Sequence, residues 1–293
     1  MLEFDFMRRT LLAGVMLAVA LPLIGIVMIN RKTSMVSDAL SHVSLLGVGI
    51  GLMGGFDPVL GAVASCVAAA FMIEAVRARL PHFGDMSVAV IMSAGLGLAV
   101  ILADLAPGGN TFESYLFGSI ASVTLIDLLW TAVVFLAVVA VSIICYAALL
   151  DLAVDVTLAR LAGVKVGVVN GIFTLLSAIT IGLACKVVGA LLVVSLVTLP
   201  VATALLVSRS YKQTCILSVV LGVIYTLCGL SFSYYYDVRP GGAIVVAAVI
   251  GIILFTIYGR LCRRPKTMVE ASVPTKVEAS APTKINKTAA AGE

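Results

Sequence analysis

The sequence has little charge and few histidines. Only 12% of its 293 residues are Asp, Glu, Lys or Arg, whereas soluble domains carry about 25%. Hydrophobic residues make up 61% of the chain, and the mean hydropathy is +1.18. This composition excludes a soluble globular domain and indicates a polytopic membrane protein. The net charge of +4 does not suggest nucleic-acid binding, because in membrane proteins the placement of Lys and Arg matters more than their sum.

Several chemical motifs are also missing. The six cysteines occur singly, without a Cys-x-x-Cys pair, so they are interpreted as small apolar side chains. The chain has no phosphate-binding Gly-x-x-x-x-Gly-Lys-Ser/Thr loop and no cytoplasmic segment long enough for a nucleotide-binding domain. It also lacks His-Glu-x-x-His, which argues against an intramembrane metalloprotease. We therefore expect a transport protein rather than an enzyme, with any ATP hydrolysed by another polypeptide.

Apolar runs close to the roughly 20 residues that cross a bilayer recur along the chain. They predict an all-α, polytopic transmembrane helical bundle over residues 1–264, with about nine spans and eight as the alternative. Residues 265–293 are rich in Ala, Thr, Pro, Lys and Glu and contain an imperfect repeat, which predicts a disordered cytoplasmic tail. The expected spans are 10–29, 36–54, 58–76, 87–106, 124–149, 166–184, 187–207, 214–232 and 241–260.

The positions of the basic residues predict the orientation. With the tail in the cytoplasm and nine spans, eleven Lys and Arg side chains before the tail lie inside and four lie outside. Such a bias follows the positive-inside rule. Nine crossings put the N-terminus outside, whereas eight would put both ends inside.

One of the two histidines lies at the start of the second apolar run, in Ser37-Asp38-Ala-Leu-Ser-His42. Residues i and i+4 stack on one face of a helix, so Asp38 and His42 can share a ligand. Their oxygen and nitrogen donors suit a divalent metal. Because an ionisable residue within a span costs about 2.5 kcal/mol or more, the pair is our candidate site for a transported ion.

Two structural interpretations compete with this hypothesis. Asp38 can simply favour the positive end of a helix from its first turn, and His42 can be a hydrogen-bonded polar residue inside the bundle.

The face of the predicted helix next to this pair is made mostly of small residues, which would let another helix approach closely. We expect the ion site to lie at such a helix contact. The residues of this face are Ser37, Ser41, Ser44, Val48 and Gly51.

Four segments together carry a resemblance to a known family. Asp-Ala-Leu-Ser-His after Arg31-Lys32 resembles the signature of the membrane subunits of bacterial zinc and manganese ABC importers, which are relatives of the siderophore and cobalamin permeases. The similarity extends from about residue 7 to about residue 262, with one departure at Leu45-Leu46-Gly47, where the family usually has a proline. The other three segments run from Lys186 to Ala204, from Ser233 to Val245, and over Tyr115-Leu-Phe-Gly118-Ser.

The resemblance implies a fold like that of type II ABC importer permeases and a multi-pass protein of the bacterial cytoplasmic (inner) membrane. It implies a separate ATP-binding cassette ATPase subunit, an extracytoplasmic metal-binding protein and a second permease protomer as partners. The cargo would be zinc or manganese, with iron as a further candidate, and we expect no permanently bound cofactor. Two copies of Asp38 and His42 across a two-fold axis near the small-residue face would offer four ligands. A stand-alone secondary metal transporter or channel is the alternative.

The segment from Asp151 to Lys165 predicts a short amphipathic helix that ends at Gly163. In the resembled family this position contributes the coupling helix that docks into the ATPase. We expect its apolar side to make that contact, and the alternative is a helix on lipid headgroups. The residues of the predicted coupling contact are Val154, Asp155, Leu158, Leu161 and Gly163.

We expect simpler roles for the remaining polar residues and for the helix-breaking glycine and proline. Gly189 and Pro200 are candidates for a kink or gating position, with a static kink as the alternative for Pro200. A short re-entrant or interfacial helix is expected from Tyr115 to Ile120, and His82 is expected to be a solvated loop residue. No transport role is assigned to the polar residues near predicted span ends, where solvation is cheap. These residues are Glu74, Asp104, Asp127, Asn170 and Lys186.

Overall fold

All the regular secondary structure in the described part of the chain is helical. The computed structural model describes residues 5–31, 33–80, 83–105, 109–118, 123–154, 163, 166–208, 210–236 and 238–262. The all-α prediction is confirmed. The helices are α1 (Asp5–Asn30), α2 (Ser34–Gly54), α3 (Pro58–Arg79), α4 (Gly84–Leu105), α5 (Gly109–Phe117), α6 (Leu125–Ile144), α7 (Tyr146–Val154), α9 (Val166–Val187), α10 (Ala190–Val207), α11 (Tyr211–Tyr236) and α12 (Pro240–Cys262).

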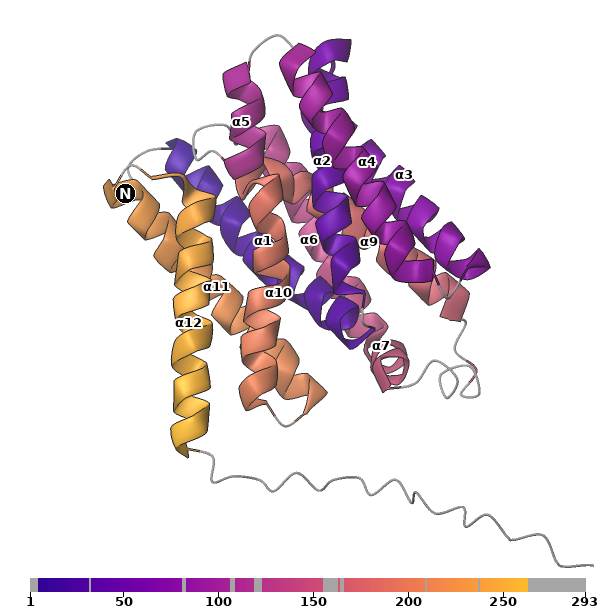
Figure 1. Cartoon of the computed structure of the whole chain (residues 1–293). Coiled ribbons are helices and arrows are strands. Elements are labelled where there is room, and N and C mark those ends of the chain that lie inside the picture. The colour runs from indigo at the N-terminus through magenta and orange to yellow at the C-terminus, as the bar shows by residue number, and fades with distance from the viewer. Residues whose placement is uncertain are drawn as a thin grey trace, which may run out of the picture.

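The long helices form one bundle in which the chain runs back and forth (Figure 1). Eight of the described helices are long and apolar enough to span a membrane, and α10 is apolar over the shorter stretch Leu192–Val207. The start of α1 and the end of α12 lie at opposite ends of the bundle (Figure 1). We call the end where α1, α3 and α12 finish the inner end and the opposite end the outer end. By the distribution of basic residues, the inner end is expected to face the cytoplasm.

The helix boundaries correct two expectations. The predicted span 124–149 is divided, because α6 ends at Ile144 and α7 begins at Tyr146. The 20 residues of α6 already reach about 30 Å, the thickness of the hydrocarbon core, so the apolar residues beyond it belong to another helix. The short helix at the outer end is α5, which begins at Gly109, before the predicted start at Tyr115, and ends at Phe117, whereas Ile120 lies outside the described residues.

Helix α2 packs extensively against α3 and α4, and it also contacts α9 and α10. The Ser65 hydroxyl of α3 donates to the Val43 carbonyl of α2 at 3.1 Å, and the Cys66 thiol donates to the Leu40 carbonyl at 3.3 Å. The two backbones come so close at Gly47 that a Cβ there would overlap the carbonyl of Gly61. The small residues of α2 and α3 therefore allow close packing between helices of the same chain.

The outer ends of α5, α9 and α10 meet through their backbones. Gly118 and Gly189 have φ angles of +78° and +100°, in the left-handed region that favours glycine. A Cβ on Gly118 would lie 2.6 Å from the Val188 carbonyl oxygen, and one on Gly189 would lie 2.5 Å from the Gly118 nitrogen. Gly189 is the N-cap of α10, so it forms the turn after α9, whereas Pro200 lies inside α10.

Candidate functional site

Asp38 and His42 lie on the same side of α2, as their spacing predicts. The Nε2 atom of His42 is 3.5 Å from a carboxylate oxygen of Asp38. The side chain of His42 is 17% exposed and that of Asp38 is 36% exposed, so both are only partly buried. Because α2 begins at Ser34 and its first turn holds no acidic residue, Asp38 does not act as a charge in that turn.

The pair occupies the partly exposed face of α2, in the order expected for one helical stripe. Met35 lies before the pair with 66% of its surface exposed, and Ile50 and Met53 follow with 46% and 49%. Apolar side chains therefore flank the pair along the helix. In Figure 1, α10 and α4 run on either side of α2.

The adjacent small-residue face packs closely against other helices, as expected, but these helices belong to the same chain. Ser37, Ser41, Ser44 and Val48 are each at most 1% exposed, so this face is covered within the chain. Its serine hydroxyls donate to backbone carbonyls of α2 itself. The expectation that a second chain approaches near this face is wrong, because neighbouring helices of the same chain already fill the space. A second copy would have to approach over the face that carries Asp38.

The imidazole of His42 has one nitrogen directed at Asp38 and one buried nitrogen, Nδ1, with no hydrogen-bond partner in the described structure. Buried polar atoms usually have a partner, so Nδ1 is an exception, whereas an ion shared with Asp38 would bind the other nitrogen, Nε2. The described residues contain no cluster of three or more His, Cys, Asp or Glu side chains able to hold a metal. Asp38 and His42 thus provide one carboxylate and one imidazole per chain, which can bind a divalent ion only weakly.

The predicted coupling segment is described in part. Val154 is the last residue of α7, a helix that begins at Tyr146, before the start of the predicted amphipathic helix. Gly163 is exposed and has a φ of +81°. Asp155, Leu158 and Leu161 lie outside the described residues, as does His82, so the amphipathic helix stays a prediction.

The sequence did not predict a polar network at the inner end of the bundle. The Arg31 guanidinium donates to the side-chain oxygen of Asn170, and the Asn170 side-chain nitrogen donates to the Glu74 carboxylate. We call these three residues the inner-end network. Asn170 is only 8% exposed, although its position near a helix end had indicated easy solvation. Burial lowers the pKa of the Arg31 guanidinium, and the Glu74 carboxylate opposes this shift.

A second polar contact, also unexpected, joins α6 and α9 at the outer end. The Lys186 Nζ atom lies 2.6 Å from Oδ2 of Asp127, and the two side chains are 13% and 11% exposed. The same carboxylate accepts from the Thr124 backbone and hydroxyl, in a capping box at the start of α6. We call this ion pair, with the backbone contact of Gly118 and Gly189, the outer-end contact. The only signal in the sequence was a cation and an anion near the ends of two predicted spans.

Comparison with known proteins identifies the family. Residues 3–259 match the ABC 3 transport family. The chain belongs to this family. It is therefore a multi-pass membrane permease subunit rather than an enzyme, as the sequence predicted.

Similar proteins match nearly the whole chain. A probable metal transport system membrane protein of Treponema pallidum is 33% identical over 87% of this chain and 96% of its own length. The manganese transport system membrane protein MntC of Listeria innocua is 27% identical over 92% and 98%. The high-affinity zinc uptake system membrane protein ZnuB of Haemophilus influenzae is 26% identical over 86% and 97%.

A solved structure supports the fold of the permease. PsaBC from Streptococcus pneumoniae in complex with Fab superposes with a TM-score of 0.78 and 27% sequence identity, covering 86% of this chain and 91% of that one. The prediction of a helical permease of the ABC importer type is therefore confirmed.

Proposed function

We propose that this permease moves a divalent transition-metal ion, zinc or manganese, across the bacterial cytoplasmic membrane and that Asp38 and His42 are its transit ligands. The observation that carries the proposal is the placement of this pair on the partly exposed face of α2, between apolar neighbours. Charged side chains within a span are costly and usually functional. The names of the manganese and zinc relatives support the same class of cargo.

Two permease protomers would complete the site. One carboxylate and one imidazole are too few to hold a transition metal firmly, but a two-fold axis over the exposed face of α2 would bring two of each together. Four oxygen and nitrogen donors without thiolate suit zinc or manganese better than copper(I). Iron remains within the range of this donor set. A site for transit must also release its ion, which favours open and weak coordination.

Energy would come from a separate ATP-binding cassette ATPase, because the sequence has no phosphate-binding loop. We propose that Val154 at the end of α7, together with Leu158 and Leu161 of the segment that follows, makes the contact. Membership in the ABC 3 transport family supports such a partner, and an extracytoplasmic metal-binding protein would deliver the ion. Charged substitutions at Leu158 or Leu161 should uncouple ATP hydrolysis from uptake while metal binding is retained.

Reconstitution tests this function. The permease would be placed in liposomes with its ATPase, and uptake of radioactive Zn²⁺ or Mn²⁺ would be measured with and without ATP. We expect uptake only with both subunits and ATP, and loss of uptake in His42→Ala and Asp38→Ala permeases that still insert and assemble. Uptake by the permease alone would instead indicate a secondary transporter or channel. Wild-type rates in His42→Ala would show that the pair is structural.

A further inference from the structure

The inner-end network connects three helices through one side chain. Asn170 is the fifth residue of α9, Glu74 lies near the end of α3, and Arg31 directly follows α1. The amide of Asn170 uses its oxygen toward the cation and its nitrogen toward the anion, so only one orientation of this side chain satisfies both partners. Hydrogen bonds to charged groups are stronger than those between neutral groups. The position of the α9 start thus depends on both neighbours.

The network lies between the two parts of the chain to which the proposed function assigns roles in transport. Residues 155–165, the predicted contact with the ATPase, directly precede α9, and Asn170 is in the first part of that helix. Arg31 is in the short connection between α1 and α2, seven residues before Asp38. A displacement of the α9 start would therefore reach the connection to α2 through the bond from Arg31 to Asn170.

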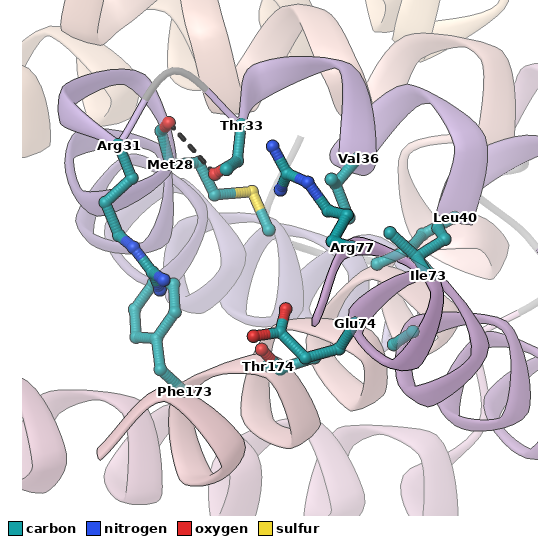
Figure 2. Close-up of a pocket in the computed structure, with 11 residues that line it drawn as sticks. Met28, Arg31, Thr33, Val36, Leu40, Ile73, Glu74, Arg77, Phe173 and Thr174 are labelled. Carbon is teal, nitrogen blue, oxygen red and sulfur yellow. Dashed lines mark hydrogen bonds between the residues drawn. The ribbon is translucent and has the colours of Figure 1, made fainter. Parts of the chain in front are cut away.

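A cavity of about 30 Å³ beside the network gives its side chains room to move. Met28, Thr33, Val36, Glu74 and Arg77 are among the residues that line it (Figure 2). A cavity of this size with polar side chains in its wall has room for a water. In Figure 2 the Glu74 carboxylate and the Arg77 guanidinium extend from α3 into the space between α2 and α9.

The charges in this region do not favour a separate anion site. The Glu74 carboxylate accepts from Asn170 and lies near Arg31, and Glu74 lines the same cavity as Arg77. Arg77 also has the Asp85 carboxylate at 4.0 Å. The two cations thus have two acidic neighbours, so the network is better suited to joining helices than to binding a ligand.

We propose that Asn170 is a positioning residue for transport, transmitting displacement of the ATPase-contacting segment to α2 and hence to Asp38 and His42. This inference rests on the proposed function. It requires that the bonds of Asn170 couple ATP hydrolysis to ion movement without taking part in metal binding. A merely structural role would instead lower the stability of the permease and leave unchanged the number of ions moved per ATP.

Reversing the donor and acceptor of one bond separates these roles. Asn170→Ala removes both bonds, and Asn170→Asp keeps an acceptor for Arg31 but places a carboxylate against Glu74. In the double variant Asn170→Asp/Glu74→Gln the new carboxylate accepts from Arg31 and from the new amide, which restores both bonds. Glu113→Gln, in the exposed pair with Arg239 at the outer end, is the matched control for Glu74→Gln.

The measurement is the number of Zn²⁺ or Mn²⁺ ions taken up per ATP hydrolysed, in liposomes that contain the permease and its ATPase. We expect about a tenfold or greater loss in Asn170→Ala and Asn170→Asp, as for the loss of one bond to a charged group, with ATP hydrolysis and metal binding retained. The double variant should recover most of the ratio, and Glu113→Gln should equal the wild type.

The outcomes are distinguishable. An unchanged ratio in assembled Asn170→Ala, or no recovery in an assembled double variant, would overturn the positioning role. If Asn170→Ala fails to assemble, the comparison of Asn170→Asp with the double variant decides. Absence of ATP-driven uptake by the wild-type complex would overturn the proposed function and, with it, this inference.

Discussion

Helix α9 is held differently at its two ends. At the outer end Lys186 contacts Asp127 directly at 2.6 Å, and the backbones at Gly118 and Gly189 meet without space for a Cβ. At the inner end Asn170 joins Arg31 and Glu74 beside a cavity of about 30 Å³. Short contacts without free volume fix a position, whereas long side chains beside a cavity permit several. The difference indicates that the outer end of α9 is fixed in position and that its inner end can shift.

The largest effect is expected from filling the backbone contact at the outer end. Gly189→Val would place a branched side chain at a φ of +100° and against the Gly118 backbone. Strain and overlap together should destabilise the permease by about 4 kcal/mol. Gly167→Val in α9 is the control, because a Cβ there meets nothing within 4 Å. Thermal unfolding of the purified proteins compares the two, and equal losses would refute the importance of the contact.

Breaking the ion pair of the outer-end contact should be the next largest effect. Asp127→Ala leaves the Lys186 ammonium shielded without its partner and should cost about 3 kcal/mol. Asp127→Ala combined with Lys186→Met should cost less than the sum of the two single changes, because no unpaired charge remains. Chemical denaturation of the four proteins gives this cycle. Additive losses would mean that the pair contributes no mutual stabilisation.

The inner-end network should contribute less to stability than the outer-end contact does. We expect Asn170→Ala to lower the free energy of unfolding by about 1.5 kcal/mol, because the cavity lets water replace part of the lost bonds. The same denaturation assay checks this value against Asp127→Ala. A loss as large as that of Asp127→Ala would remove the contrast between the two ends of α9.

The smallest effect is expected at the exposed pair of Glu113 and Arg239. These side chains are 2.8 Å apart but more than half exposed, so Glu113→Gln should change stability by about 0.5 kcal/mol or less. The Arg239 guanidinium also lies 4.6 Å from the Phe117 ring centroid, a contact that the change leaves in place. Unfolding at low and high salt tests this, and a salt-independent loss above about 1 kcal/mol would contradict the surface character of the pair.

The sequence predicted most of the fold because apolar run length is a local property. Runs of about 20 residues identify membrane helices wherever a breaker separates them. The division of the predicted span 124–149 was missed because both α6 and α7 are apolar, and no Gly or Pro separates them at Cys145. The start of α10 was placed too early because the role of Gly189 depends on contact with the distant Gly118.

The distinction between local patterns and contacts of distant residues also applies to the polar side chains. The contact of Asp38 with His42 could be predicted because their i, i+4 spacing determines it within one helix. The partners of Asn170 lie 139 and 96 residues away in the sequence, and those of Lys186 lie 59 away. Pattern analysis therefore assigned these residues only to span ends. The sequence also could not predict which face of α2 stays partly exposed, because this depends on the packing of α3, α9 and α10.

Metal stoichiometry tests most directly the claim that two copies of Asp38 and His42 form one transit site. The purified permease would be titrated with Zn²⁺ and Mn²⁺ at equilibrium, with His42→Ala in parallel and the number of chains per particle measured on the same sample. The account predicts one ion per two chains in the wild type and loss of this site in the variant. One ion per chain, or unchanged binding in assembled His42→Ala, would contradict it.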